Sequence, residues 1–377
     1  MSTGKDNPIY VTRPNLPPME KLLPFLEKIW DTKILTNIGP FHDRFEEALS
    51  AYLRVDHVNL FTNGTIALIV GLQSLRITGE VITTPYSFVA TTHALKWNGI
   101  TPVFCDIEPR TLTIDPDKIE ALITPKTTAI LPVHVYGHPC ATEKIQAIAD
   151  KYGLKVIYDA AHAFGVQPAH KNLLLEGDMS VLSFHGTKLF TTFEGGAIIT
   201  SDLKLKQRID FLKNFGFADE VTVIAPGING KMNEFQAVMG LLGLDIVQQE
   251  IEDRKTVAHT YLEQLKMIHG IKTFTLPEEV TYNYSYFPVL IDETEFGVNR
   301  ETVYEELKKH HIYARRYFYP LISDMPSYRS LASAAAENLP IARKVSGQVL
   351  CLPIYGTLGL DVVSEIATII KSLGSMA

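Results

Sequence analysis

Short apolar segments alternate with longer stretches of helical periodicity over the first half of the chain. The apolar segments have the length and composition of buried strands and lie at 58–61, 81–84, 101–104, 128–133, 155–158, 179–182 and 197–200. Between several of them apolar residues recur at helical spacing, at 65–75, 88–97 and 141–151. Strands that alternate with helices predict an α/β fold, in which a mostly parallel sheet is covered by helices on both faces and ligands bind at the carboxyl ends of the strands.

The pattern changes in the second part of the chain. A long stretch of helical spacing covers 247–267, and it is followed by a strand-like segment at 282–291 and helical segments at 300–309 and 362–373. We therefore expect a large domain over residues 1–247 and a smaller C-terminal α/β domain over residues 248–377.

Composition narrows the class of protein. The 377 residues are 46% hydrophobic, which is enough for a sizeable core. The formal net charge is −7 and no long run of Lys and Arg occurs, so nucleic acid and anionic membranes are not expected partners. The N-terminal segment lacks the pattern of a secretory signal, and no segment has the length and apolarity of a membrane span. These features predict a cytoplasmic protein.

No metal site is expected from the Cys and His residues. Cys105, Cys140 and Cys351 are far apart in sequence and odd in number, which predicts reduced, buried thiols rather than disulfides. His134 and His138 have the i, i+4 spacing of a zinc motif, but the glutamate and the helix of that motif are missing.

The most informative residue is a lysine in a short loop. Lys188 lies between two apolar segments that predict buried strands, whereas most lysines of a soluble protein are simply solvated. Upstream, Asp159 follows a strand-like segment, where a buried carboxylate requires a cation partner. A lysine that can form an imine and a carboxylate that can keep a pyridine nitrogen protonated are the minimal equipment for pyridoxal phosphate chemistry. His162, three residues after Asp159, can reach the same ring.

Further residues near the predicted carboxyl ends of the strands could contact the phosphate and the ring of such a cofactor, although each also has a plainer interpretation. Gly64 and Thr65 lie where a strand gives way to a helix, which suits a phosphate but also an ordinary turn and N-cap. Phe88 can stack on a cofactor ring or belong to the core. Ser183 is a candidate phosphate donor, and His185 either lines the site or is structural.

In combination these motifs resemble a known family, the sugar nucleotide aminotransferases of the DegT/DnrJ/EryC1/StrS type. The resemblance extends over nearly the whole chain, and its motifs are Asn63-Gly-Thr, Tyr86-Ser-Phe-Val-Ala-Thr, Asp159-Ala-Ala-His, Ser183-Phe-His-Gly-Thr-Lys, Glu194-Gly-Gly-Ala and Asn229-Gly-Lys-Met-Asn-Glu. It implies the aspartate aminotransferase fold of type I pyridoxal phosphate enzymes, with a seven-stranded type of sheet in the large domain.

The resemblance also implies roles for individual residues. It makes Lys188 the residue that binds the cofactor covalently and moves protons, and it places Asp159 at the pyridine nitrogen, with His185 among the catalytic candidates. The other cofactor contacts that it implies are Gly64, Thr65, Phe88, His162 and Ser183, with Asn229 from the other subunit of a homodimer. Candidate substrate contacts are Lys231, Tyr317 and Tyr319.

The chain departs from many relatives at two places. Gly230 and Lys231 stand where many relatives have Tyr and Arg, which removes an aromatic ring and replaces a planar guanidinium by a point charge. Ile322 stands where relatives often have His.

The resemblance predicts transfer of an amino group from L-glutamate to a keto sugar on a nucleoside diphosphate, through pyridoxamine phosphate. The forms of the motifs look most like members that make dTDP-4-amino-4,6-dideoxyglucose from dTDP-4-keto-6-deoxyglucose, a sugar suited to a surface polysaccharide or a decorated metabolite. A 3-keto sugar substrate and a cofactor-binding regulatory protein of the same fold remain alternatives. A sugar 3-dehydratase has histidine in place of the lysine, so Lys188 argues against it.

Overall fold

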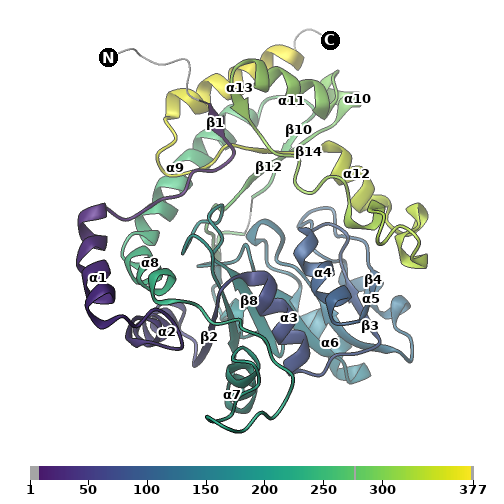
Figure 1. Ribbon diagram of the computed structural model, residues 1–377. Helices are drawn as coiled ribbons and strands as arrows, with labels where there is room; N and C mark the ends of the chain where they lie inside the picture. Colours follow the sequence, from purple (N-terminus) through teal and green to yellow (C-terminus); the bar gives the residue numbers. More distant parts are fainter. Residues whose placement is uncertain (1–7, 276, 375–377) are drawn as a thin grey trace.

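The computed structural model describes residues 8–275 and 277–374, and its centre is a mostly parallel sheet (Figure 1). In this part of the chain the sheet has seven strands in the order β2-β9-β8-β6-β5-β3-β4. Their bounds are β2 (His57–Phe61), β3 (Glu80–Thr83), β4 (Thr101–Phe104), β5 (Thr127–Leu131), β6 (Lys155–Asp159), β8 (Met179–Ser183) and β9 (Gly196–Thr200). β9 is antiparallel to both of its neighbours and the other pairings are parallel. The predicted α/β fold is therefore confirmed.

Helices cover both faces of this sheet. The helices are α1 (Met19–Thr32), α2 (Pro40–Leu53), α3 (Gly64–Ser74), α4 (Val89–Trp97), α5 (Pro116–Ile119), α6 (Thr142–Tyr152), α7 (Leu203–Leu212), α8 (Glu234–Leu244), α9 (Val247–Leu265), α10 (Glu293–Phe296), α11 (Arg300–Lys309), α12 (Pro340–Gln348) and α13 (Leu360–Gly374). Ala197 and Ile199 of β9 pack in the same core as α2 and α8, whereas Ile198 packs with α3, α4 and α7. Because successive side chains of a strand point to opposite faces, a strand buried on both sides is apolar throughout.

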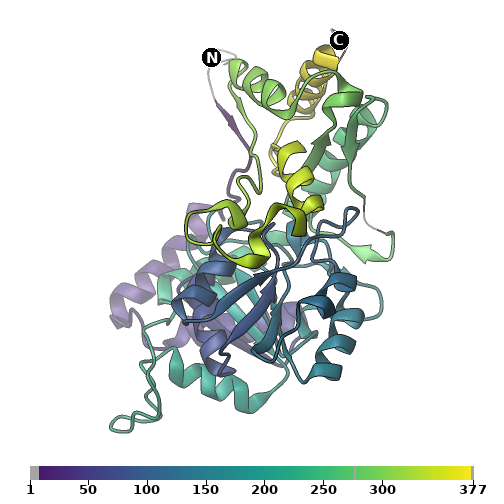
Figure 2. The same ribbon diagram turned by 90° about the vertical axis from the view of Figure 1, so that its right-hand side faces the viewer.

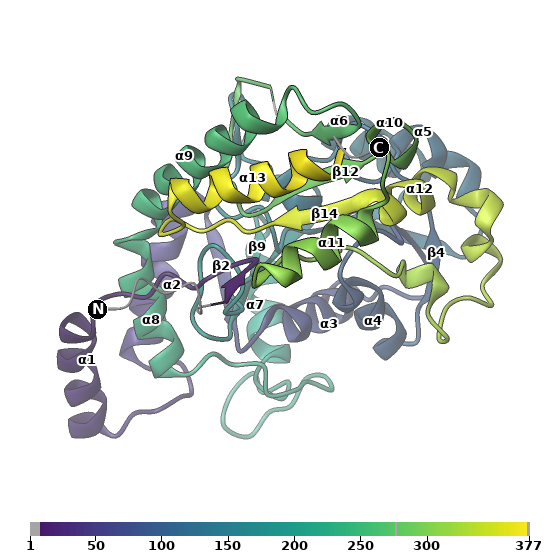
Figure 3. The same ribbon diagram turned by 90° about the horizontal axis from the view of Figure 1, so that it is seen from above.

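A smaller antiparallel sheet forms a second layered unit (Figures 1 and 3). Its order is β10-β12-β14, with β10 (Ile271–Thr273), β12 (Phe287–Ile291) and β14 (Val349–Leu352), and its core includes residues of α9, α11 and α13. The other short strands are β1 (Ile9–Tyr10), which pairs with β13 (Ile312–Tyr313), and β7 (Gln167–Pro168), which pairs with β11 (Val280–Thr281).

The connection between the two units is the long helix α9. Val247 and Ile251 near its start are buried in the core of the large sheet, whereas Val257 and Ala258 are buried in the second core. The helix is thus shared by both cores, and the domain boundary after residue 247 stays a prediction.

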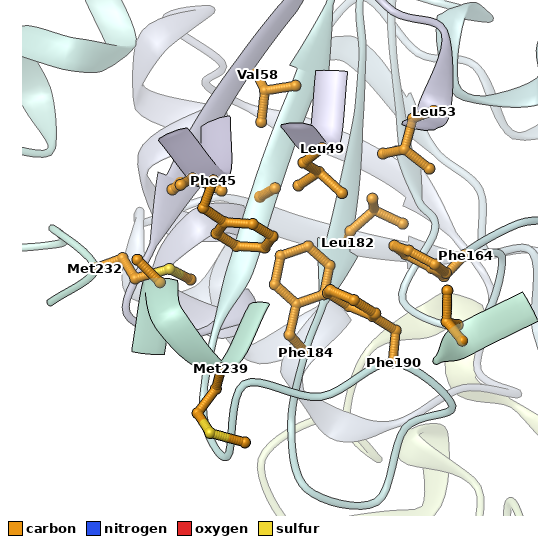
Figure 4. Close-up of a cluster of buried hydrophobic side chains, with 14 of the residues drawn as sticks. Phe45, Leu49, Leu53, Val58, Phe164, Leu182, Phe184, Phe190, Met232 and Met239 are labelled. Atoms are coloured by element: carbon orange, nitrogen blue, oxygen red, sulfur yellow. The ribbon is translucent and has the colours of Figure 1, made fainter. Parts of the chain in front are cut away.

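One aromatic core lies directly beneath the loop that carries Lys188 (Figure 4). Phe184 and Phe190, which precede and follow Lys188 in this loop, pack edge to face with ring centroids 5.1 Å apart. Phe164 stacks on Phe190 at 4.3 Å with nearly parallel rings, and Phe45 of α2 packs against both Phe184 and Phe190. These contacts fix both arms of the loop on the buried side.

A buried carboxylate joins α2 to α8. The N–H groups of Phe41 and His42 in the first turn of α2 each donate to a carboxylate oxygen of Glu234, at 2.9 Å. The carboxylate therefore meets N–H groups that have no acceptor within their own helix, at the end where the helix dipole favours a negative charge.

Cys105, Cys140 and Cys351 are buried and free, as expected. Among the described helices, none combines the length and the apolarity that crossing a membrane requires. Residues 1–7, over which the absence of a secretory signal was judged, lie outside the described residues.

The packing of α8 on α2 generates a stability prediction. A Cβ at Gly240 would lie 2.3 Å from Cζ of Phe45, so Gly240→Ala overpacks the core and lowers the free energy of unfolding by about 1–3 kcal/mol. Gly347 in α12 has nothing within 4 Å of such a Cβ, so Gly347→Ala raises the free energy of unfolding by up to about 1 kcal/mol. Denaturant unfolding of both variants and the parent measures this. A Gly240→Ala variant as stable as the parent would contradict the close packing.

Candidate active site

A cavity of about 330 Å³ lies at the carboxyl ends of the parallel strands. Most of the predicted site residues line it, namely Gly64, Thr65, Phe88, Asp159, His162, Ser183, His185, Lys188 and Tyr317. They come from the ends of β6 and β8, the starts of α3 and α4, the loop after β8 and a segment that follows β13. Residues spread over most of the sequence thus meet in one cavity.

One corner of the cavity is the N-terminus of α3. Asn63 caps this helix by accepting the N–H of Ile66 on its side chain, at 2.9 Å. Gly64 and Thr65 follow in the first turn, whose N–H groups lack acceptors in their own helix. A Cβ at Gly64 would lie 3.0 Å from Cβ of Ser183, so glycine permits the close approach of this helix to the end of β8. The corner combines a positive helix end with a hydroxyl, which suits a phosphate.

The carboxylate of Asp159 lies buried at the end of β6. The hydroxyl of Thr91 donates to its Oδ2 at 2.7 Å, and the N–H of Ala161 donates to its Oδ1 at 3.1 Å. Burial raises the pKa of Asp159, while these two hydrogen bonds and the charge of Lys188 act in the opposite direction. Both oxygens are therefore oriented by donors, and the ionised form needs a further cation.

The amine of Lys188 lies in the same cavity. Its Nζ donates to the hydroxyl of Tyr286 at 3.1 Å. Burial lowers the pKa of Lys188 to about 8, against the opposing influence of Asp159 and Tyr317. A much larger share of this amine is neutral near physiological pH than for an exposed lysine, and the neutral form is the nucleophile and the base.

The ring of His162 is held in one tautomer. Its Nδ1 accepts the backbone N–H of Tyr136 at 3.1 Å, so in the neutral ring the proton is on Nε2. Burial and the charge of Lys188 keep the pKa of His162 well below the usual range, which favours the neutral ring. The ring stacks on Phe318, with centroids 5.9 Å apart and planes 4° apart. His162 can therefore offer an N–H to an oxygen in the cavity.

A segment after β13 closes another wall of the cavity. The hydroxyls of Tyr86 and Tyr136 lie within hydrogen-bond distance of each other and of the backbone carbonyl of Tyr317, so one hydroxyl donates to the carbonyl while the other donates to its hydroxyl neighbour. Arg315, Tyr317 and Phe318 of this segment line the cavity. Two tyrosines that follow strands of the large sheet thus hold a segment contributed by the C-terminal part.

His185 lies in the more exposed part of the cavity lining. Its Nδ1 is 2.8 Å from the hydroxyl of Thr187, and its Nε2 is 3.5 Å from a carboxylate oxygen of Glu194. The contacts of its ring nitrogens that the structure gives are thus with neighbours on the same loop. Its catalytic role stays a prediction.

Three predicted site residues lie outside this cavity. Asn229 is exposed on the loop between α7 and α8. Lys231 is buried, its Nζ donates to Oδ1 of Asn214 at 2.7 Å and lies over the ring of Phe215. Tyr319 is exposed and packs under the guanidinium of Arg300. Within one chain the fold does not bring these three to Lys188.

The two departures from the family pattern have local explanations. A Cβ at Gly230 would lie 3.0 Å from Ile66 and 3.1 Å from Phe61, so a side chain here requires its neighbours to shift. Ile322 is fully buried, and its N–H donates to the carbonyl of Pro85. An apolar residue suits that position.

The two histidines with zinc-like spacing have other partners. Nδ1 of His134 accepts the N–H of Cys140, and Nδ1 of His138 bonds the carbonyl of Thr111. Over residues 8–275 and 277–374, no group of three or more His, Cys, Asp and Glu is arranged to hold a metal ion.

Several residues that line or support the cavity were not predicted from the sequence. Thr91 lies in the helix after Phe88, but nothing in the sequence pairs its hydroxyl with Asp159. Tyr286 lies in the segment 282–291, which we predicted as one strand, whereas the strand begins only at Phe287 and the preceding residues turn toward the cavity. Arg315 lies two residues before Tyr317, a predicted substrate contact, and this proximity was the available signal for it.

Comparison with known proteins identifies the family. The profile of the DegT/DnrJ/EryC1/StrS aminotransferase family matches residues 19–371. The chain is 55% identical to a dTDP-4-amino-4,6-dideoxy-D-glucose transaminase of Escherichia coli, over 98% of this chain and 100% of that protein. It is 48% identical to a transaminase of the same name from Shigella dysenteriae, with the same coverage.

A solved structure agrees with the sequence comparison. DesI, crystallised in the presence of its TDP-sugar product, superimposes with a TM-score of 0.94 at 36% identity, and the match covers 98% of this chain and 94% of that one. The resemblance inferred from the motifs is therefore confirmed over nearly the whole length, and the chain belongs to the DegT/DnrJ/EryC1/StrS aminotransferase family.

Proposed function

We propose that the protein transfers an amino group from L-glutamate to dTDP-4-keto-6-deoxy-D-glucose and so forms dTDP-4-amino-4,6-dideoxy-D-glucose. The observation that carries the reaction class is the meeting of the Lys188 amine and the Asp159 carboxylate in one buried cavity. The names of the two transaminases with 55% and 48% identity support the sugar. The cytoplasmic location expected from the sequence stays part of the proposal.

The cavity fits pyridoxal 5′-phosphate, the cofactor of this aminotransferase family. Gly64, Thr65 and Ser183 would hold its phosphate, because the helix end and the hydroxyl favour an anion. Asp159 would hold the pyridine nitrogen, which supplies the cation that this buried carboxylate needs. When bound, the protonated ring serves as the electron sink for the substrate carbon that loses its proton.

Other residues of the chain would orient the Asp159 carboxylate, move a proton and donate a hydrogen bond. Thr91 and the N–H of Ala161 keep the carboxylate of Asp159 in one orientation. Nζ of Lys188, with its pKa lowered to about 8, takes a proton from one carbon atom and delivers it to a second carbon atom. The N–H on Nε2 of His162 is available to a ring oxygen.

The exposure of Phe88 favours a role in stacking on a ligand over a role in the core. Its side chain is 55% exposed, although it directly precedes α4 at the carboxyl edge of the sheet, and it lines the cavity. An aromatic ring left open on a cavity wall offers its face to a planar ligand.

We further propose a homodimer with shared sites. The loop between α7 and α8 projects from the body of the molecule (Figure 2) and bears exposed apolar side chains at Phe215, Phe217, Val223 and Ile224. Exposed apolar groups of this extent favour association with another protein surface. Asn229 lies on the same loop, and in a dimer it would reach the phosphate end of the partner's cavity.

The first test follows the cofactor absorbance through a complete cycle. Protein loaded with pyridoxal phosphate should lose its visible absorbance with L-glutamate and regain it with dTDP-4-keto-6-deoxyglucose, and mass and NMR analysis should identify the 4-amino sugar. Lys188→Ala should lower turnover at least about a thousandfold, because base and nucleophile are both removed. Lys155→Ala, which removes a partly exposed lysine paired with Asp178, is the control and should retain activity.

Three outcomes would contradict this proposal in different ways. Absorbance that glutamate discharges but this sugar does not restore would keep the aminotransferase and reopen the sugar, including a 3-keto sugar. Absorbance that neither substrate changes would favour a cofactor-binding regulatory protein. Near-normal turnover of Lys188→Ala would refute the role of the lysine.

The carboxylate generates a second prediction. Asp159→Asn should retain the fold, since an amide oxygen still accepts from Thr91, but should lower the rate about a hundredfold or more because the ring nitrogen loses its charged partner. Asp178→Asn changes a carboxylate near the opposite end of β6, where it accepts from Lys155 and Val156, and is the matched control. Steady-state kinetics compare the two. Equal activity of both variants would remove Asp159 from the mechanism.

Shared sites generate a third prediction, tested by complementation. Asn229→Ala should weaken cofactor affinity, whereas Glu220→Ala on the same loop should not. At a cofactor concentration that leaves Asn229→Ala dimers empty, co-expressed Lys188→Ala and Asn229→Ala chains should regain about a quarter of the parent activity, because half of randomly paired dimers contain one intact site. Activity no higher than that of the separate variants would refute the sharing of Asn229.

A further inference from the structure

We propose that Tyr286 is a positioning residue for Lys188: its hydroxyl holds the lysine amine at the place where the amine meets the cofactor carbon. This inference rests on the proposed function and adds to it a residue that neither the motifs nor the family comparison assigned.

The contact itself is direct. Nζ of Lys188 donates to the hydroxyl oxygen of Tyr286 at 3.1 Å and lies 5.7 Å from the centre of its ring. Burial raises the pKa of Tyr286 far above neutrality, so the partner is a neutral hydroxyl rather than a phenolate. A neutral acceptor orients an N–H of the amine without removing its lone pair, which remains available for attack or for a proton.

The ring of Tyr286 is fixed by the walls of the cavity. It packs at 4.8 Å from the ring of His162, at 5.5 Å from Tyr136 and at 5.7 Å from Tyr317. His162 and Tyr317 line the cavity, and the hydroxyl of Tyr136 lies at the carbonyl of Tyr317. The hydroxyl therefore has little freedom to move away from Lys188.

The backbone before Tyr286 is anchored by one buried side chain to the segment that follows β6. Nδ2 of Asn283 donates to the carbonyls of His162 and Phe164, at 2.8 and 2.9 Å. Oδ1 of Asn283 accepts the N–H of Ser285 at 3.0 Å. A Cβ at Gly137 would lie within 3.2 Å of Tyr282 and Asn283, so glycine permits this close approach.

A buried ion pair anchors the same segment to α9. Arg254 donates to the carbonyl of Ser285 and pairs with Glu250 through its Nε, at 2.6 Å. Glu250 in turn accepts the N–H of Gly356 at 2.9 Å. Tyr286 is thus placed by contacts to the segment after β6 on one side and to the helix shared by both cores on the other.

A lysine side chain has four rotatable bonds, so the amine samples many positions unless a partner restrains it. The step that depends on its position is simple in atoms: the amine of Lys188 adds to the aldehyde carbon of pyridoxal phosphate, and one water leaves as the carbon–nitrogen double bond forms. No oxidant or reductant takes part. Loss of the Tyr286 hydroxyl should slow this step while leaving the phosphate site intact.

The test mixes apoprotein with pyridoxal phosphate in a stopped-flow spectrophotometer and separates initial binding from lysine capture. Tyr286→Phe should slow the first-order capture about tenfold, because even a small displacement of the Lys188 amine lowers the rate of its reaction. Its affinity for pyridoxamine phosphate, which has no aldehyde to capture, should stay within about twofold. The matched control is Tyr284→Phe, since this tyrosine packs on Tyr282 and His259 and does not line the cavity.

The outcomes distinguish a positioning role of Tyr286 toward Lys188 from a purely structural role. Slow capture with unchanged pyridoxamine phosphate affinity in Tyr286→Phe alone supports the proposal. Capture at the parent rate overturns it, and so does an equal loss of capture and of pyridoxamine phosphate affinity, which would mean a structural role. If the parent apoprotein itself captures no cofactor, the proposed function fails, and that result is distinct from a failure confined to Tyr286.

Discussion

The structure of this site depends on one constraint: a carboxylate and an amine must both be kept in a buried cavity without forming a direct ion pair with each other. Asp159 and Lys188 line the same cavity, and burial disfavours the charged form of each. No direct ion pair joins them among the contacts of the described residues. Asp159 is instead held by Thr91 and by the N–H of Ala161, and Lys188 by Tyr286. Space is thereby left between the two groups for a ligand that pairs with both.

This arrangement requires both layered units of the chain. Asp159 and the helix end at Gly64 belong to the large sheet, whereas Tyr286 immediately precedes β12 of the small sheet. Tyr86 and Tyr136 hold the carbonyl of Tyr317, and α9 contributes to both cores. The cavity is therefore a product of the contact between the units. This placement agrees with the tendency of small-molecule sites to form between structural units.

The sequence predicted the sheet well because its signal is local. The segments 197–200 and 300–309 agree with β9 to within one residue and with α11, since an apolar run buried on two faces and an amphipathic stretch each carry their own pattern. Asp159 and Gly64 likewise lie in one cavity, as predicted, because parallel strands bring their carboxyl ends together, and their roles there stay predictions. The family resemblance then linked them to a cofactor.

What the sequence did not predict depends on distant contacts. Tyr286 was assigned to a strand, because nothing local indicates that Asn283 binds two carbonyls in the segment after β6. Thr91 is recognised only when its distance from Asp159 is known. Asn229 and Lys231 lie outside the cavity of their own chain, so their predicted cofactor and substrate contacts require a second subunit.

The most direct measurement of the central constraint is the pKa of Lys188 in apoprotein. It is obtained from the pH dependence of the acetylation of Lys188 by acetic anhydride, followed by peptide mass spectrometry. Labelling should rise with pH and level off above a pKa of about 8, because burial favours the neutral amine. A pKa near the ordinary 10.5 would show that the amine is as well solvated as one on the surface, which would contradict its burial in the cavity.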